Sequence, residues 1–241
     1  MKVYAHTKKG KEKEENQDRI VVGYNILASG TYSTFLDRGI VAVADGVGGN
    51  SGGVVASSYV ANEFAKLIEI NEASFININN QLLDLASKNV NISKMATTAS
   101  GIYIDGNKIS MFHIGNTRVY SVQGGYLRQL TVDDTLVEFL VRTGQLTHEE
   151  AETFERRNEI NACFGGNSNL FDIKLSEFDI SNISKLLITS DGVHEYISID
   201  DIEDILASDR TGIEICETIV QKSLENDSDD DLSIVLIDCS E

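Results

Sequence analysis

Along the first fifty residues, apolar positions gather in short runs that polar or glycine-rich segments separate. The runs at residues 1–6, 19–27 and 39–44 have the length of strands, so we expect three strands there. From residue 51 to residue 70 the apolar residues recur at intervals of three and four, which is the spacing of one helix face. Residues 74–90 have a similar pattern, and the sequence therefore predicts a second amphipathic helix.

Residues 100–130 form a block of alternating runs and turn signals. The runs are SGIYI, KISMFHI, RVYSV and YLRQL, and the triplets between them are Asp105-Gly106-Asn107, Gly115-Asn116-Thr117 and Gln123-Gly124-Gly125. An Asp-Gly pair between two alternating runs is a strong signal for a two-residue turn. The block therefore predicts antiparallel hairpins.

The second half of the chain groups its helices and strands. We expect helices at 133–143 and 148–157, followed by a glycine-containing loop at 163–169. Strands are expected next at 171–176 and 185–189, then helices at 199–206 and 213–224, and last a strand at 232–238. Such grouping favours an α+β fold with mainly antiparallel sheet over a doubly wound parallel fold. No proline-rich or Ser/Gly-rich linker interrupts the 241 residues, so we expect one domain.

Composition narrows the classes of partner. The formal net charge of −18 would repel nucleic acid and anionic lipid, so we expect neither as a partner. No run approaches the roughly 18 apolar residues of a membrane helix, and no signal-peptide core is evident, which predicts a cytoplasmic protein. The three cysteines form no CxxC pair, so neither a disulfide framework nor a thiolate zinc site is indicated.

Four aspartates share one placement, at the end of an apolar run where a strand should pass into a turn: Asp18, Asp45, Asp191 and Asp230. A single aspartate there is typical of a turn or a cap. Four such sites together suggest a ligand set, because rigid strand ends fix each carboxylate in place. Carboxylates, backbone carbonyls and water suit hard cations such as Mg²⁺ or Mn²⁺.

The glycine-rich residues 46–53 lie between a predicted strand and a predicted helix, so we considered a nucleotide-binding loop. A GxGxxG pattern from Gly46 fails at Ser51, and no Lys-Ser or Lys-Thr follows to make a P-loop. The simpler interpretation is that Gly46 leaves its carbonyl accessible to a metal. The acidic run 227–231 is not a calcium loop of the EF-hand type, because Leu232 stands where that loop needs glycine.

Eight segments occur in the order ENQDR, VAVADGVGGNSGG, MATTASG, HIGNTRVY, LTVDD, RRNEINACFGG, LLITSDGVHEYI and DDLSIVLI. This ordered set resembles the type 2C family of metal-dependent serine/threonine protein phosphatases, in its compact bacterial form, from about residue 13 to residue 237. The resemblance implies a four-layer α/β-β/α sandwich of two mainly antiparallel sheets flanked by helices. It also implies two Mn²⁺ or Mg²⁺ ions in a cleft at one edge of the sheets.

The resemblance assigns roles by motif position. It implies that Asp45 bridges the two ions and that Gly46 adds its backbone carbonyl to one of them. Asp191 and Asp230 would complete the ligand set, and Asp18 would lie beside them, bonded to metal-bound water. These four aspartates are thus the expected catalytic residues. The implied reaction is in-line attack on phosphorus by the water that bridges the ions.

Departures from the family pattern are informative. Lys13 stands where many relatives have an arginine that clamps substrate phosphate, and lysine lacks the bidentate fork. Lys13 could equally be a solvated charge in the run KKGKEKEEN. Asn116 replaces an aspartate that helps to bind a third metal in bacterial relatives, so a third ion, held with Asp191 and Glu195, should bind weakly. Gln17 precedes the first aspartate and could still orient water.

Residues 131–166 correspond to the flap of the family, which lies beside the cleft. Val47 stands where animal relatives have a histidine that is proposed as general acid. His113 and His194 are no obvious substitutes, and we interpret each as a partly buried, hydrogen-bonded histidine.

The leading hypothesis is a hydrolase of phosphoserine and phosphothreonine in proteins. A weakly active or inactive regulator that binds phosphoproteins is the alternative, and a nucleotide-dependent oxidoreductase would rest on the glycine loop alone. Expected partners are phosphorylated protein substrates, together with a partner Ser/Thr kinase and its targets. We expect a monomer.

Overall fold

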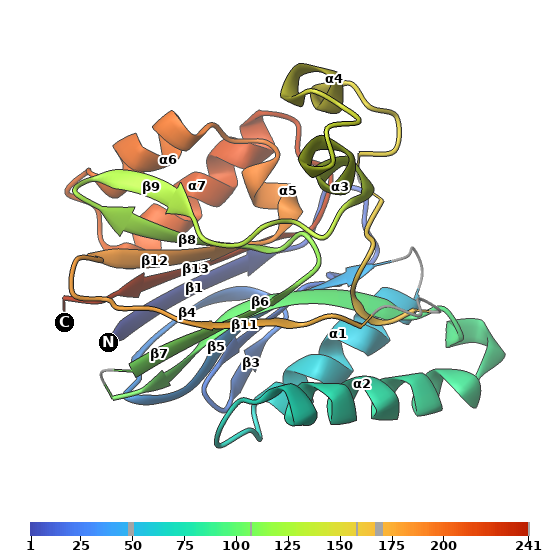
Figure 1. Cartoon of the computed structure of the whole chain (residues 1–241). Helices are drawn as coiled ribbons and strands as arrows, with labels where there is room; N and C mark the ends of the chain where they lie inside the picture. Colours follow the sequence, from blue (N-terminus) through green and yellow to red (C-terminus); the bar gives the residue numbers. More distant parts are fainter. Residues whose placement is uncertain (48–50, 107, 158, 167–170, 241) are drawn as a thin grey trace.

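The computed structural model describes residues 1–47, 51–106, 108–157, 159–166 and 171–240. Two β-sheets lie face to face, and helices cover their outer faces (Figure 1). The predicted α+β class and the four-layer sandwich are thus confirmed. The predictions for Gly48–Asn50, Asn107, Asn158 and residues 167–169 lie outside the described residues.

The first sheet has six strands in the order β4-β1-β13-β12-β8-β9, and each neighbouring pair is antiparallel. Its strands are β1 (Lys2–Lys8), β4 (Gly30–Phe35), β8 (Arg118–Gln123), β9 (Tyr126–Gln129), β12 (Lys185–Thr189) and β13 (Leu232–Asp238). The β1–β13 pair joins the two ends of the chain in the centre of this sheet.

The second sheet runs β11-β7-β6-β5-β2-β3, with β10 also paired to β6, and is likewise antiparallel. Its strands are β2 (Arg19–Val22), β3 (Asn25–Leu27), β5 (Arg38–Val47), β6 (Ala96–Asp105), β7 (Lys108–Ile114), β10 (Phe164–Gly165) and β11 (Lys174–Glu177). The long pair β5–β6 keeps register from Arg38↔Asp105 to Val47↔Ala96.

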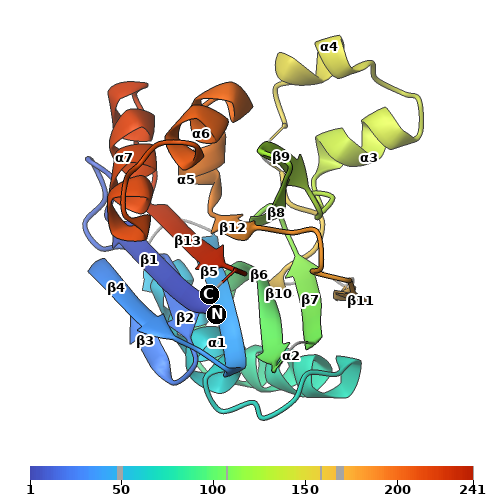
Figure 2. The ribbon, with the colours of Figure 1, turned by 90° about the vertical axis from the view of Figure 1, so that its left-hand side faces the viewer.

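The helices form two outer layers and one separate lobe. The second sheet is covered by α1 (Ser51–Phe64) and α2 (Glu72–Ser87), with the short turn η1 (Val90–Ile92) after them. The first sheet is covered by α5 (Asp191–His194), α6 (Ile199–Leu206) and α7 (Gly212–Glu225). The lobe contains α3 (Leu136–Arg142) and α4 (His148–Glu152) and projects beyond the layers (Figure 2). Over the described residues, no helix combines the length and apolarity required to cross a bilayer.

Side-chain alternation explains the three apolar layers. Residues such as Val3, Val43 and Val235 point inward and fill the space between the sheets, where they are fully buried. Under α1 and α2 the core is aromatic: Phe64 packs edge-on against Phe112, with ring centroids 5.1 Å apart. Edge-to-face contacts of this kind stabilise aromatic pairs beyond the area that they bury.

Several element boundaries differ from the sequence predictions. The predicted strand 19–27 is wrong as one strand, because Gly23 (φ 59°) turns the chain there into the β2–β3 hairpin. The helix predicted for 51–70 ends at Phe64, and Ile68 beyond it is 73% exposed, although its spacing fits the helix face. The edge strand β4 was missed, because GTYSTF is largely exposed and carries few apolar residues.

Candidate active site

Antiparallel pairing brings the four predicted aspartates to one edge of the sandwich. Arg19 at the start of β2 pairs with Ala44 near the end of β5, so residues 18 and 45 lie at the same end. Thr189 at the end of β12 pairs with Ile234 near the start of β13, so residues 191 and 230 also lie together. The starts of β2 and β13 therefore lie at the same edge as the ends of β5 and β12, and this edge carries the four aspartates.

Asp18 is fully buried directly before β2. Its Oδ2 accepts a hydrogen bond of 2.8 Å from the Ser190 hydroxyl, and its Oδ1 has no partner among the described residues. Burial raises the pKa of Asp18 to about 7, hydrogen bonds from Ser233 and Ser190 oppose this, and the nearby charges of Asp231 and Asp191 add to it. The sequence analysis missed Ser190 and Ser233, although each lies next to a predicted aspartate motif.

Asp45 lies inside β5, which runs three residues beyond the predicted strand end. Burial raises the pKa of Asp45 well above its usual value, and the charges of Asp191, Asp18 and Asp230 raise it further. Gly46 packs too tightly for any side chain: a Cβ there would lie 2.5 Å from the carbonyl oxygen of Gly53. The position thus requires glycine for a steric reason, in addition to the carbonyl access that the sequence analysis expected of Gly46.

Asp191 opens α5 immediately after β12. Its Oδ2 accepts a hydrogen bond of 2.9 Å from the amide of Asn116. Burial raises the pKa of Asp191, and the charge of Asp230 raises it further, while the bond from Asn116 opposes them. The carboxyl groups of Asp191 and Asp45 are within hydrogen-bonding reach of each other. These carboxylates therefore share one electrostatic environment.

Lys13 lies at the rim of this group, not in a free solvated run. Its Nζ is 2.6 Å from Oδ1 of Asp230, and the two side chains are 34% and 43% exposed. Burial alone would lower the pKa of Lys13, but the bond to Asp230 and the charges of Asp230, Asp231 and Asp45 outweigh it and raise that pKa. The ammonium group is therefore charged at neutral pH and lies close to the carboxylates.

Asp231 holds the loop that carries Lys13, a role that the sequence analysis did not assign to it. It is 2% exposed, and its two carboxylate oxygens accept hydrogen bonds from the backbone N–H groups of Gly10 (2.9 Å) and Gln17 (2.8 Å). Lys13 lies between these two donors in the sequence. Gly10 packs against the backbone carbonyls of Asp229 and Asp230, where a Cβ would collide. Asp231 thus ties the loop 10–17 to the loop that carries Asp230.

Asn116 and Glu195 lie beside Asp191. Asn116 is 4% exposed, and its Oδ1 has no hydrogen-bond partner within the described part of the chain. Glu195 follows α5 at its C-cap, and burial, together with the charge of Asp191, raises its pKa. The structure thus brings both residues, which were predicted for a weak third ion, next to a predicted ligand.

The donor set fits divalent cations. Burial and mutual repulsion raise the pKa values of Asp18, Asp45 and Asp191, so the charge of Lys13 at the rim does not compensate these buried carboxylates. Two buried oxygens, Asp18 Oδ1 and Asn116 Oδ1, accept no hydrogen bond from any residue that the structure describes. Among the described residues, no three acidic, histidine or cysteine side chains are tight enough to hold one ion unaided. Mg²⁺ commonly keeps several waters and takes only one or two carboxylates.

A hollow of about 310 Å³ separates this group from the α3–α4 lobe. Asn116 and Glu195 line one side, and the lobe contributes side chains that include His148 and Arg157. At the base of the lobe, Leu136 donates its N–H to the carbonyl oxygen of Glu159. The lobe therefore faces Asn116 and Glu195 across this hollow, whose lining residues do not include the four aspartates.

Both histidines near the site are hydrogen-bonded, as predicted, but they are more deeply buried than the partial burial expected, at 2% exposure for His113 and 8% for His194. His113 Nδ1 lies 2.7 Å from the Ser100 hydroxyl, and His194 Nδ1 lies 2.9 Å from the Thr189 hydroxyl. Burial lowers the pKa of both imidazoles, so they are neutral at pH 7.

Comparisons with known proteins give matches over nearly the whole chain. The family model described as Protein phosphatase 2C matches residues 7–234. Protein phosphatase PhpP of Streptococcus pneumoniae (serotype 2, strain D39) is 27% identical, with 100% of this chain and 98% of PhpP covered. Serine/threonine phosphatase stp of Listeria monocytogenes (serovar 1/2a) is 26% identical, with 96% and 93% covered.

Solved structures agree with these sequence matches. Serine/threonine phosphatase Stp1 from Staphylococcus aureus superposes with a TM-score of 0.84 at 26% identity, covering 98% of this chain and 94% of that one. The Mycobacterium tuberculosis phosphatase PstP/Ppp gives a TM-score of 0.82 at 25% identity, with 99% of each chain covered. Since the family model spans nearly all of the chain and the fold and the order of the motifs agree with it, the chain belongs to the protein phosphatase 2C family.

Proposed function

We propose that this chain is a metal-dependent phosphatase that hydrolyses phosphoserine and phosphothreonine monoesters in proteins. The observation that carries the proposal is the gathering of Asp18, Asp45, Asp191 and Asp230 at one sheet edge, with Lys13 at its rim. A carboxylate cluster by itself would repel a phosphate. Divalent cations make it a phosphate site, because they reverse the sign of the local charge.

In this proposal, Asp45, Asp191, Asp230 and the carbonyl of Gly46 hold two Mn²⁺ or Mg²⁺ ions. When bound, the ions would supply Lewis acidity to the phosphate and lower the pKa of a water. Asp18, with its free Oδ1, would accept a hydrogen bond from water at the site and so orient it.

The remaining residues act on the substrate and on a third ion. Lys13 would contribute positive charge to the substrate phosphate, but without the fork of an arginine. For that role the Nζ of Lys13 must either leave Asp230 or contact Asp230 and the phosphate at the same time. Asn116 and Glu195 would bind a third ion weakly, because Asn116 offers an oxygen without a charge.

The wider assignments are also proposals. We infer one phosphatase domain over residues 1–241, with residues 131–166 acting as the flap that selects substrates across the 310 Å³ hollow. We further propose a cytoplasmic monomer that acts on phosphoproteins, including a partner Ser/Thr kinase and its targets. A second candidate, a weakly active regulator that binds phosphoproteins, is favoured by the neutral Asn116 and by the Lys13–Asp230 ion pair.

Hydrolysis of p-nitrophenyl phosphate with and without Mn²⁺ tests the proposal. Asp45→Ala and Asp191→Ala should each abolish turnover, whereas Asp204→Ala, on the exposed side of α6, should retain it. Turnover that persists in EDTA, or in both site variants, would contradict the assignment. Binding of a phosphopeptide without turnover would select the regulator.

A further inference from the structure

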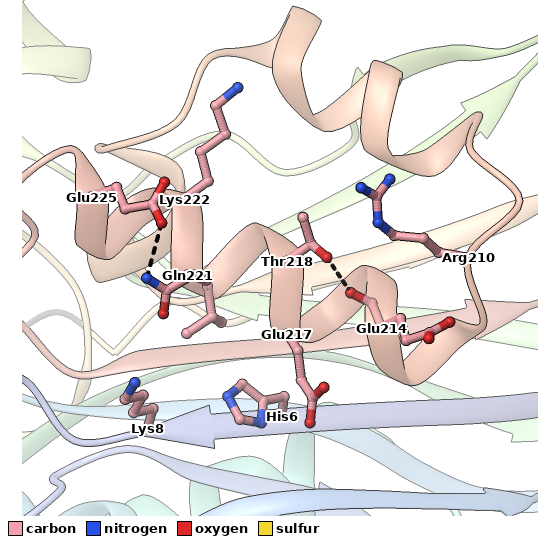
Figure 3. A pocket seen from close by; sticks show the side chains of 10 residues that line it. His6, Lys8, Arg210, Glu214, Glu217, Thr218, Gln221, Lys222 and Glu225 are labelled. Carbon is pink, nitrogen blue, oxygen red and sulfur yellow. Dashed lines mark hydrogen bonds between the residues drawn. The ribbon is translucent and has the colours of Figure 1, made fainter.

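A groove of about 850 Å³, lined mostly by charged and polar residues, follows the exposed side of α7 above β1 (Figure 3). His6 and Lys8 project from β1 beneath α7, because the outward positions of this strand alternate with its buried ones. The other wall comes from one face of α7, including Glu217, Gln221 and Glu225. With 14 residues, α7 is about 21 Å long, enough to lie alongside about six extended residues of another chain.

This groove ends beside the loop that carries Asp230. A second hollow, of about 660 Å³, shares Lys8, Gln221 and Glu225 with the first and extends to Gly10 and Lys11. Gly10 packs on the backbone of the loop that carries Asp230, and three residues later the same segment reaches Lys13. A peptide whose phosphorylated residue lies at the carboxylates can therefore pass directly into the groove.

Three lysines at this junction have no acidic partner. Lys8, Lys9 and Lys11 are exposed and line the second hollow, and no ion pair joins any of them to a described carboxylate. Lys9 and Lys11 donate to the backbone carbonyls of Lys13 and Leu224, which fixes their side chains but leaves their charge uncompensated. Three ammonium groups without a described ion pair thus lie together in a chain with 38 acidic and 20 basic residues.

The fold also separates these lysines from the acids of their own segment. The run KKGKEKEE has nearly balanced charge, yet Glu12, Glu14 and Glu15 are absent from the residues that line the hollow. On the opposite wall, Glu225 accepts a hydrogen bond from Gln221 at 3.0 Å, and Glu217 lies further along, near His6. Asp227 also lines the second hollow, so three ammonium groups there face two carboxylates, and the excess of positive charge is limited to this part of the groove.

We propose that Lys8, Lys9 and Lys11 bind acidic side chains of the phosphoprotein substrate, on one side of its phosphorylated residue. The inference rests on the proposed function and specifies its substrate class as sites flanked by Asp or Glu. Most of the surface repels such a segment, because the net charge is −18. Screening limits that repulsion to roughly 8 Å at physiological ionic strength, so lysines in direct contact decide where the segment binds.

Two phosphothreonine peptides test this: one with Glu at the flanking positions and one with Gln. The intact protein should bind the Glu peptide more tightly by fluorescence anisotropy and cleave it with the higher kcat/KM, and the difference should shrink as salt rises. In Lys8→Glu/Lys11→Glu the preference should fall by about tenfold. Lys8→Gln, which leaves every described hydrogen bond intact, should reduce it by about twofold to threefold.

The control is Lys108→Glu/Arg128→Glu, which makes the same change in net charge at two exposed positions without described ion pairs. It should keep the preference for the Glu peptide. Equal binding of both peptides by the intact protein, or equal loss in the control, would overturn the inference. Because anisotropy needs no turnover and p-nitrophenyl phosphate needs no docking, failure of this inference is distinguishable from failure of the proposed function.

Discussion

Asp231 lies in the acidic loop 227–231. Among the acidic residues of that loop, it should be the one whose replacement by alanine destabilises the chain most. The side chain is 2% exposed, and both of its oxygens are used, by Gly10 N at 2.9 Å and Gln17 N at 2.8 Å. Hydrogen bonds to a charged acceptor contribute about 1.5–3 kcal/mol each, so the pair represents about 3–6 kcal/mol.

Part of that loss is offset. The charge of Asp231 raises the pKa of Asp18, so removing it relieves repulsion within the cluster. We therefore expect the free energy of unfolding to fall by about 3 kcal/mol in Asp231→Ala, and by about half as much in Asp231→Asn, which keeps one acceptor.

Urea unfolding in EDTA measures this difference, with an unchanged m-value as the check that the same transition is observed. The matched control is Asp229→Ala: this neighbour is exposed, and its carboxylate accepts only a 3.4 Å bond from Tyr196. The control should change stability by less than about 0.5 kcal/mol. A loss below about 1 kcal/mol in Asp231→Ala, or an equal loss in the control, would refute the idea that Asp231 ties the two loops together.

Four further outcomes are expected. Titration calorimetry with Mn²⁺ should resolve at most two tight sites, and Asn116→Asp should strengthen a third; three comparable sites in the unchanged protein would contradict the role given to Asn116. Saturating Mn²⁺ at 100 times its Kd should stabilise the fold by about 2.7 kcal/mol, seen as a higher Tm, and Asp45→Ala should abolish that shift. In saturating Mn²⁺, which would keep the site carboxylates deprotonated, the lowered pKa values of buried His113 and His194 mean that the unfolded chain binds more protons below its histidine pKa of about 6.5, so stability should decrease as pH falls from 7 to 5.5, and the decrease should be smaller in His194→Asn. Without metal, the raised pKa values of Asp18, Asp45 and Asp191 act in the opposite direction, so the decrease should be reduced or reversed in EDTA. Phe64→Ala, at the centre of the aromatic cluster, should cost about 3–5 kcal/mol by thermal or urea unfolding without altering the Kd for Mn²⁺.

The local pattern of apolar residues predicted an element correctly where the residues of that element alone determine its structure. The strand at 185–189, the helix at 199–206 and the strand at 232–238 have the boundaries that periodicity predicts. Prediction failed where a neighbour decided the outcome: nothing local shows that Ile68 lies outside its helix or that GTYSTF pairs with β1 as an edge strand. Edge strands bury little, so their apolar pattern is weak.

The amino-acid sequence alone supplies the chemical groups of this protein: four aspartates at the ends of apolar runs, a glycine that allows close backbone packing, and a lysine near the first motif. Which of these groups act on one another depends on how the two sheets pack. Asp18 and Asp191 are 173 residues apart, yet β2 and β12 bring them together, and the burial that follows raises both pKa values. Mutual repulsion and loss of solvation depend on distance and burial, and these quantities exist only once the sheets have packed.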